Sequence, residues 1–375
     1  MGEGNIPFAP SFDHLVYIRV FEGCNLRCKH CFIPPNPKAM SFEDILRIPD
    51  LLSDKIPKGQ NVLMQWHGGE PTMFGAEWMS KALHSLTDDK RYNFIHGIQT
   101  NLLTYSPEWK EVYKKYFGGE VGVSWDPKIR IYNGAVNELE SNRKYEEVFW
   151  DNLEKLVADG LDPYLVVTGT KVFFEHFKNP IDFFELLSSK GIKRAHIERV
   201  TSTGFARRNW LEVGVNNKEY STYMSRFARS YSLWSDLQNK NGGKNLFLSP
   251  FDGLTNSIKD KIDGKPAGYG CWSGKCDTKF HTIDANGYKV GCTAINSEID
   301  NKQANEKLVL DLENLSKERA ERQIYYCNSC EFRHICNTGC LAIDFDDGSG
   351  ECSGGKSFFK SLENIIVNQE RTNGK

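Results

Sequence analysis

The sequence lacks any apolar run of the roughly 20 residues that a transmembrane helix requires, and residues 1–11 contain no basic segment followed by an apolar one. We therefore expect a cytoplasmic protein with no membrane partner. An excess of charge of either sign is also missing, because 47 lysines and arginines face 49 aspartates and glutamates. A net charge of -2 gives no reason to expect nucleic acid as a partner.

Cysteine is absent from residues 32–270, so the eleven cysteines fall into two groups, three before residue 32 and eight between Cys271 and Cys352. An odd number of thiols cannot be paired completely, and disulfides are rare in a reducing compartment. Both points favour metal ligation. The chain of 375 residues is long enough for one barrel-sized domain and a smaller one.

The first group consists of Cys24, Cys28 and Cys31, in a C-x3-C-x2-C loop directly after the apolar run 15–21. Spacing this tight lets one loop wrap a single metal centre. Closed zinc and iron–sulfur sites use four protein ligands, so three cysteines without a fourth nearby leave one coordination position open. A structural zinc loop, or three unrelated thiols, is the simpler alternative.

Strand-like and helix-like segments alternate from residue 15 to residue 200. We expect strands at 15–21, 61–66, 94–98, 120–125, 164–168 and 195–200, and helices at 42–55, 76–86, 107–117, 145–159 and 181–189. Ser41 should cap the helix at 42–55, with Asp44 in the capping-box position. Six such units predict an α/β fold, a partial (β/α)6 TIM-like barrel, although a flat doubly wound sheet has the same pattern. In either fold, reactive groups are expected at the C-terminal strand ends.

The amphipathic pattern is clearest in the helix expected at 145–159. Its predicted buried face consists of Val148, Phe149, Leu153, Leu156 and Val157.

Two glycines and an acid follow the second expected strand, as Gly68, Gly69 and Glu70, with Pro71 after them. Glycine lets the backbone approach a ligand closely, and Glu70 supplies a carboxylate. One strand after a C-x3-C-x2-C loop whose last cysteine follows His30, this GGEP motif resembles that of the radical S-adenosylmethionine (SAM) enzymes.

The resemblance implies that the catalytic residues Cys24, Cys28 and Cys31 hold a 4Fe-4S cluster, with SAM bound through its amino and carboxylate groups to the fourth iron. It also implies that the backbone and acid of the GGEP motif hold the SAM amino group. We expect His30, in the cluster loop, to belong to the same cofactor site.

Further SAM contacts are expected at the ends of the next strands, where the family places ribose and carboxylate contacts. Asn101 ends the third strand, and Ser124 and Asp126 resemble the family's S-x-D pattern. Glu198 is a further cofactor-binding candidate. Thr168, Lys171 and Arg199 occupy equivalent strand ends and are candidates for the pocket wall. Polar residues that merely end strands and cap turns are the alternative.

A helix is expected at 215–240, and the glycines in the segment 241–244 predict a flexible break after it. We place the domain boundary there, which gives a barrel domain at 1–240 and a cysteine-rich domain at 241–375. The eight cysteines of the second domain would fill two closed four-thiolate sites. By spacing alone, these could be zinc sites of an interaction module.

The order of these eight cysteines resembles the SPASM extension found behind radical SAM barrels in peptide-modifying enzymes. The resemblance implies two auxiliary 4Fe-4S clusters. The first would be held by Cys271, Cys276, Cys292 and Cys340. The second would be held by Cys327, Cys330, Cys336 and Cys352.

Two groups of SPASM enzymes are candidates. In anaerobic sulfatase maturases, an aspartate directly after the cysteine of G-x4-C acts as the base in formylglycine formation, but here that position is Thr293. A threonine hydroxyl cannot replace a carboxylate as a general base near neutral pH. A general base supplied from nearby by Asp284, Glu298 or Asp300 is the weaker interpretation.

We therefore favour the other group, maturases that cross-link side chains of ribosomally made peptides through C–C, ether or thioether bonds. The expected partners are a precursor peptide and an external reductant such as flavodoxin or ferredoxin. Only about a dozen residues precede the first strand, too few for a packed leader-binding domain, so leader recognition should come from the enzyme body or a separate protein. A non-catalytic, zinc-stabilised interaction protein is the alternative of another class.

Overall fold

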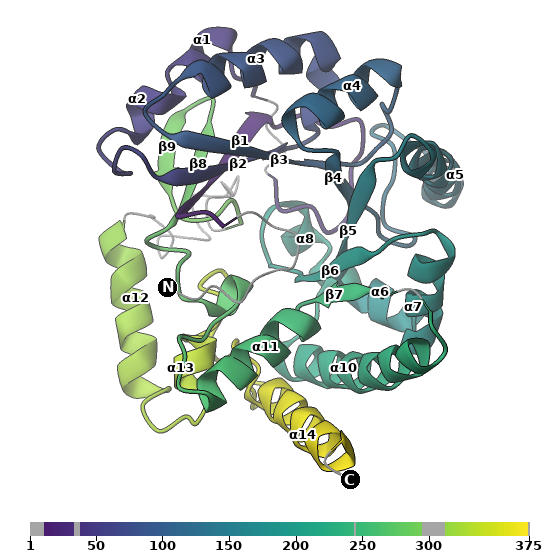
Figure 1. Cartoon of the computed structure of the whole chain (residues 1–375), viewed down its shortest axis with the longest axis vertical. Helices are drawn as coiled ribbons and strands as arrows, with labels where there is room; N and C mark the ends of the chain where they lie inside the picture. The colour runs from purple at the N-terminus through teal and green to yellow at the C-terminus, as the bar shows by residue number, and fades with distance from the viewer. Residues whose placement is uncertain (1–10, 34–37, 244, 295–311, 374–375) are drawn as a thin grey trace.

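The computed structural model describes residues 11–33, 38–243, 245–294 and 312–373. In this part of the chain, nine strands form one sheet in the order β7-β6-β5-β4-β3-β2-β1-β8-β9 (Figure 1). Neighbouring strands are parallel throughout, except that β9 runs antiparallel to β8. The strands are β1 His14–Phe21, β2 Asn61–Gly68, β3 Asn93–Thr100, β4 Glu120–Ser124, β5 Asp162–Gly169, β6 Arg194–Arg199, β7 Phe247–Ser249, β8 Phe280–Asp284 and β9 Gly287–Val290.

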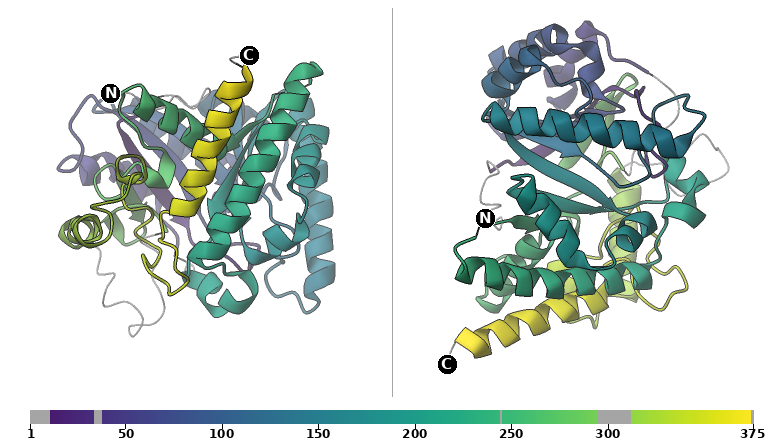
Figure 2. Two further views of the ribbon diagram at one scale, coloured as in Figure 1. Left: turned by 90° about the horizontal axis from the view of Figure 1, so that it is seen from below. Right: turned by 90° about the vertical axis from the view of Figure 1, so that its right-hand side faces the viewer.

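Helices connect the parallel strands and cover the outer side of the sheet, and α12, α13 and α14 follow in the C-terminal part (Figures 1 and 2). They are α1 Phe42–Leu46, α2 Ile48–Leu52, α3 Ala76–Asp88, α4 Pro107–Tyr116, α5 Glu138–Ala158, α6 Lys171–His176, α7 Pro180–Ser189, α8 Gly204–Arg208, α9 Trp210–Val213, α10 Asn217–Lys240, α11 Phe251–Ile262, α12 Leu312–Tyr325, α13 Arg333–Cys336 and α14 Lys356–Asn373, with short 3-10 turns η1 Pro71–Phe74 and η2 Gly270–Trp272.

The six predicted strands are β1 to β6, and their parallel order confirms the open, TIM-like α/β fold. The strand β1 carries a continuous apolar run because side chains on both of its faces are buried. The strand β2 instead alternates between buried and partly exposed residues. The C-terminal ends of these strands face one edge of the sheet, where the cysteine loop begins after Phe21.

The single helix predicted at 42–55 is wrong, because α1 ends at Leu46 and α2 starts at Ile48. Pro49 lies in the first turn of α2, where the amide hydrogen that proline lacks is not needed, and it cannot continue a helix from before. The capping box of Ser41 and Asp44 is confirmed.

The predicted face of α5 is partly wrong. Phe149, Leu153 and Leu156 are buried, but Val148 is 37% exposed. The helix begins at Glu138 rather than near residue 145, and its buried stripe passes through Ser141, Tyr145 and Asn152. Polar residues on the buried stripe hide its direction from a hydrophobicity pattern.

The sheet continues beyond the break at 241–244. The strand β7 pairs with β6 and β8 pairs with β1, so both edges of the six-stranded unit are extended by residues after 241. The helix α14 lies along α10 (Figure 2). The two predicted domains therefore share one sheet, and the border at residue 240 stays a prediction. In the part of the chain described here, no helix combines the length and apolar character that a bilayer crossing requires.

Candidate active site

The cysteines of the N-terminal group lie in the loop that follows β1. Cys28 is buried, and Cys24 and Cys31 are partly buried. Burial raises the pKa of all three thiols. The neighbouring thiolates add to the rise for Cys24 and Cys28, and the pKa of Cys28 reaches about 12. A metal centre supplies the positive charge that holds such thiols as thiolates, so the loop fits a metal cluster.

Three donors point at the sulfurs of this loop. The Arg130 Nη1 donates to Cys28 Sγ over 3.9 Å, and Asn101 Nδ2 donates to Cys24 Sγ over 3.8 Å. The amide of Leu26 also donates to Cys24 Sγ. Donors of this kind favour the thiolate and tune the potential of a bound cluster. Sequence reasoning missed Arg130, for which the available signal was a cation four residues after Asp126.

Asp126 lies beneath the cysteine loop and is completely buried. Its Oδ2 is 2.7 Å from Arg130 Nη2 and 3.2 Å from His30 Nε2, and its Oδ1 accepts from the Thr168 amide. Burial works to raise the pKa of Asp126, but His30 and Arg130 outweigh it and lower the pKa. In this arrangement Asp126 fixes His30 and Arg130, and its predicted contact with SAM stays a prediction.

The two glycines of the GGEP motif pack against the cysteine loop. The Gly69 amide donates to Phe21 O, and the Glu70 amide donates to Gly23 O. A Cβ on Gly69 would lie 2.0 Å from Gly23 O, and Gly68 has a φ of +124°. The glycines therefore allow the backbone of the GGEP motif to approach the backbone of the cysteine loop closely. The sequence had predicted a close approach of the backbone to a ligand instead. Pro71 starts η1 directly behind them.

The carboxylate of Glu70 is buried and accepts four hydrogen bonds. Its Oε1 accepts from the amide and hydroxyl of Thr72 and from Thr100 Oγ1, and its Oε2 accepts from the Asn101 amide over 2.7 Å. Burial raises the pKa of Glu70 although these donors oppose it. Asn101 also donates through Nδ2 to Asn25 Oδ1, which links the end of β3 to the cysteine loop.

The remaining strand-end candidates divide into two sets. Ser124, which accepts from Gln99 Nε2, lines the main cavity together with Thr168 and Glu198. Arg199 lines the cavity too, and its guanidinium donates to Ser353 O and to Asn217 Oδ1, which ties β6 to the C-terminal region. Lys171 begins α6 and is not among the residues that line the cavity.

Four C-terminal cysteines, Cys271, Cys276, Cys292 and Cys340, line the same cavity as the N-terminal three. The hydrogen bond between Cys271 and Cys340 lowers the pKa of Cys340 and raises that of Cys271. Charge on Cys292 also raises the pKa of Cys271. Charge on Cys340 raises the pKa of Cys276. Arg319 Nη2 donates to Cys276 Sγ over 3.0 Å.

The other four cysteines, Cys327, Cys330, Cys336 and Cys352, line a separate small pocket. Burial raises the pKa of Cys336, and the thiolates of the other three add to the rise. The eight thiols thus line two different pockets, four in each, and their assignment as ligands of two clusters stays a proposal. Within the described residues, no three His, Cys, Asp or Glu side chains converge closely enough to hold a single metal ion.

Thr293 lines the main cavity next to Cys292. Of the acids considered as substitutes for a carboxylate at this position, Asp284 is buried and pairs with Lys289 Nζ over 2.7 Å. Glu298 and Asp300 lie outside the described residues.

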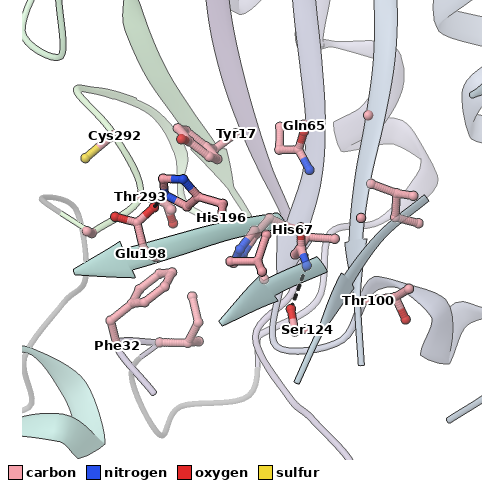
Figure 3. Close-up of a pocket in the computed structure, with 18 of the residues that line it drawn as sticks. Tyr17, Phe32, Gln65, His67, Thr100, Ser124, His196, Glu198, Cys292 and Thr293 are labelled. Atoms are coloured by element: carbon pink, nitrogen blue, oxygen red, sulfur yellow. Dashed lines mark hydrogen bonds and ion pairs between the residues drawn. The ribbon is translucent and has the colours of Figure 1, made fainter. Parts of the chain in front are cut away.

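The main cavity has a volume of about 1160 Å³. Figure 3 shows Tyr17, His67, His196, Glu198, Cys292 and Thr293 around a common space, contributed by strands β1, β2 and β6 and by the segment after β9. His67 is neutral because burial lowers its pKa to about 4, and it stacks on Phe32. The cavity is large enough for a cofactor and part of a second molecule.

Solved structures with the same fold include two peptide-modifying enzymes. The structure of native anSMEcpe with bound AdoMet and Cp18Cys peptide superposes with a TM-score of 0.66 at 16% identity, covering 95% of this chain and 96% of that one. Streptococcus suis SuiB bound to the precursor peptide SuiA gives a TM-score of 0.56 at 17% identity, covering 88% and 72%. At these identities the likeness shows the fold.

The sequence is similar to the serine-type anaerobic sulfatase-maturating enzyme of Klebsiella aerogenes, with 22% identity over 224 residues, which are 56% of this chain and 52% of the relative. The corresponding Klebsiella pneumoniae enzyme is 24% identical over 119 residues, 29% of each chain. The matched region thus spans at most about half the length of these relatives. Residues 18–187 match the family model of the radical SAM superfamily. The match therefore identifies a radical SAM domain in residues 18–187, somewhat less than half of the chain.

Proposed function

We propose that the enzyme takes a hydrogen atom from a side chain of a ribosomally synthesised precursor peptide and forms an intramolecular C–C, ether or thioether cross-link. One observation carries the proposal: the three N-terminal cysteines and the first C-terminal group of four line one cavity of about 1160 Å³. A side chain inside it would lie between a site for radical formation and a site for electron removal. The similar structures with bound peptides, anSMEcpe and SuiB, support a peptide as the substrate class.

The family implies SAM and one 4Fe-4S cluster as cofactors, and the loop of Cys24, Cys28 and Cys31 fits the cluster. Reductive cleavage of SAM at such a cluster supplies a 5′-deoxyadenosyl radical. The residues of this chain hold the loop in place, since Gly69 fixes its backbone and Arg130 and Asn101 donate to its sulfurs. The GGEP motif, with His30, Asn101, Ser124 and Asp126, is proposed to shape the SAM site.

We further propose that the two C-terminal groups of four cysteines hold auxiliary 4Fe-4S clusters, as the SPASM resemblance implies. The first group lies at the cavity wall, where it is placed to take up an electron from the substrate. The second group lies in its own pocket lined by Phe332, Phe345 and Phe359, away from the substrate space. An external reductant and a cytoplasmic location belong to the same proposal.

Cross-linking is favoured over formylglycine formation because Thr293 replaces the aspartate base and Asp284 is held by Lys289. A sulfatase-type maturase is the second candidate, which the similarity to the Klebsiella enzymes supports. The non-catalytic zinc protein is not retained, because the chain is a radical SAM enzyme.

Anaerobic coexpression with a candidate precursor peptide tests the proposal. Tandem mass spectrometry should show a loss of two hydrogens per link and no fragmentation between the joined residues. A sulfatase peptide offered in parallel should stay unmodified. An aldehyde at its cysteine or serine would establish the second candidate instead.

A further inference from the structure

The end of β6 carries a carboxylate that is oriented by a chain of hydrogen bonds. Glu198 Oε2 lies 3.0 Å from His196 Nε2, and His196 Nδ1 lies 2.6 Å from Ser249 Oγ. Tyr269 donates its hydroxyl to Ser249 Oγ over 2.9 Å. With Tyr269 donating to Ser249 and Ser249 donating to His196 Nδ1, the proton of a neutral His196 sits on Nε2 and points at Glu198.

Glu198 differs from the other carboxylates that line the main cavity. Glu22 forms a buried ion pair with Arg19, and Glu120 pairs with Arg194 over 3.0 Å. Glu70 is occupied by its four donors. Within the described part of the chain, the second oxygen of Glu198 accepts one long contact of 3.3 Å, from the Arg199 amide. The side chain lines the cavity and is 49% exposed.

The electrostatics of the site keep this carboxylate ionised. Burial works to raise the pKa of Glu198, but the hydrogen bond from His196, and the positive charge that His196 carries when it is protonated, outweigh burial and lower the pKa. The charge of Glu198 in turn helps to raise the pKa of Tyr17, after burial and Cys292. Tyr17 is thus near both Glu198 and Cys292, which places the carboxylate on the side of the cavity where the first C-terminal cysteine group lies (Figure 3).

We propose that Glu198, oriented by His196, is the base that accepts a proton from the peptide substrate, in place of the carboxylate that position 293 lacks. The step is a proton transfer alone. An S–H, O–H or C–H bond of the substrate breaks, an O–H bond forms on Glu198 Oε1, and the electron pair stays on the substrate. The inference rests on the proposed function, and it replaces the expectation that Glu198 contacts SAM.

Proton removal is needed whichever bond is made. Joining a side chain to an aromatic carbon, a thiol or a hydroxyl expels one proton from the receiving group, and so does oxidation of a cysteine or serine. A base at Glu198 deepens the peptide maturase proposal, but it would serve formylglycine formation as well as cross-linking. With this base present, Thr293 no longer separates the two products, and the peptide assay decides between them. His196 and Ser249 act as positioning residues, because His196 contacts Glu198 and Ser249 contacts His196.

The test uses the reconstituted holoenzyme with Glu198→Gln, Glu198→Ala and the control Glu154→Gln, an exposed carboxylate on α5. The probes are SAM alone and short synthetic peptides with a central cysteine, serine or tyrosine, together with a candidate precursor peptide. Iron content and SAM affinity should equal those of the wild type in all variants. Product formation in Glu198→Gln should fall about 10²–10⁴-fold, the usual contribution of a general base, while 5′-deoxyadenosine is still released. Added formate should restore product to Glu198→Ala.

Each other outcome overturns the proposal. Wild-type product yield in Glu198→Gln would show that Glu198 accepts no proton. A loss of SAM affinity in the same variant would make Glu198 a SAM contact, as the sequence had indicated. Peptides left unmodified by the wild-type enzyme would contradict the proposed function itself, and the role of Glu198 with it.

Discussion

Glu70 shows how one carboxylate can hold three segments of a site together. It joins η1 through Thr72 and the end of β3 through Thr100 and Asn101, and its own amide bonds the cysteine loop at Gly23. Sequence reasoning identified Glu70 as a SAM contact from the GGEP resemblance, but its four donors come from residues that no motif marks. Contacts of this kind depend on which strand ends lie side by side.

Replacing Glu70 by alanine should weaken SAM binding by about 2–4 kcal/mol, because a desolvated ammonium loses its charged partner. The Asn101 amide and the Thr100 hydroxyl also lose their acceptor, so the melting temperature should fall as well. Calorimetric titration with SAM measures the first effect, and thermal unfolding measures the second. Glu77→Ala, on the exposed first turn of α3, is the control. Full SAM affinity in Glu70→Ala would contradict the proposed contact.

His96 on β3 gives the protein a dependence on acid pH. Burial lowers its pKa from 6.5 to about 4, and Trp66 Nε1 donates to its Nδ1, which must therefore be unprotonated. At a pH between these two pKa values, His96 binds a proton in the unfolded chain but not in the folded chain. The free energy of unfolding should therefore fall as pH decreases through this window, by about 1–2 kcal/mol at pH 5 relative to pH 7 for this residue.

Urea unfolding at the two pH values measures this effect. His96→Gln should reduce the pH dependence, whereas His84→Gln, at an exposed position on α3, should leave it unchanged. An identical pH dependence in His96→Gln and the wild type would show that His96 is not responsible.

At the scale of elements, α12 braces the cysteine-rich region through two buried arginines. Arg319 bonds Cys276 Sγ, Asp277, Asn337 O and Thr338 Oγ1. One turn later, Arg322 donates to Cys340 O, Ile343 O and Ser353 Oγ. Two side chains of one helix thus hold the cysteine-rich segments, which contain little regular secondary structure, in place.

Arg319→Met should lower the free energy of unfolding by about 3–5 kcal/mol, because it leaves Asp277 buried without its cation. It also removes the donor to Cys276, so we expect loss of iron from the first C-terminal group. Thermal unfolding and iron analysis of the holoenzyme check this, with Lys317→Met on the exposed face of α12 as the control. Unchanged stability and iron content in Arg319→Met would show that α12 does not brace the cysteine-rich region.

The sequence predicts β1 to β6 because strand-like and helix-like segments alternate regularly there, although β4 and β6 contain few apolar residues. The strands β7 and β9 have three and four residues, too few for a period to appear. The strand β8 is defined by its pairing with β1, which lies more than 260 residues earlier in the chain. Non-local pairing of this kind cannot be inferred from a local pattern.

For the whole molecule, the decisive feature is the position of β1 between β2 and β8. The cysteine loop after β1 thereby meets residues from both ends of the chain, and a single cavity contains thiols that are more than 300 positions apart in the sequence, such as Cys24 and Cys340. Spacing alone left open how the eight C-terminal cysteines divide, and the grouping came from the family resemblance. His196 and Ser249 could not be found from the sequence, since only the folded chain brings them to the site.

The central claim is that Cys24, Cys28 and Cys31 hold the cluster at which SAM is cleaved. The most direct measurement is 5′-deoxyadenosine release by anaerobically reconstituted enzyme with SAM and dithionite, compared with the triple alanine variant. The wild type should carry on the order of twelve irons, from three cubane clusters, and release 5′-deoxyadenosine. The variant should lose about a third of the iron and all 5′-deoxyadenosine release, with the auxiliary clusters still present. Release of 5′-deoxyadenosine by the variant, or a colourless wild type that binds only zinc, would contradict the account.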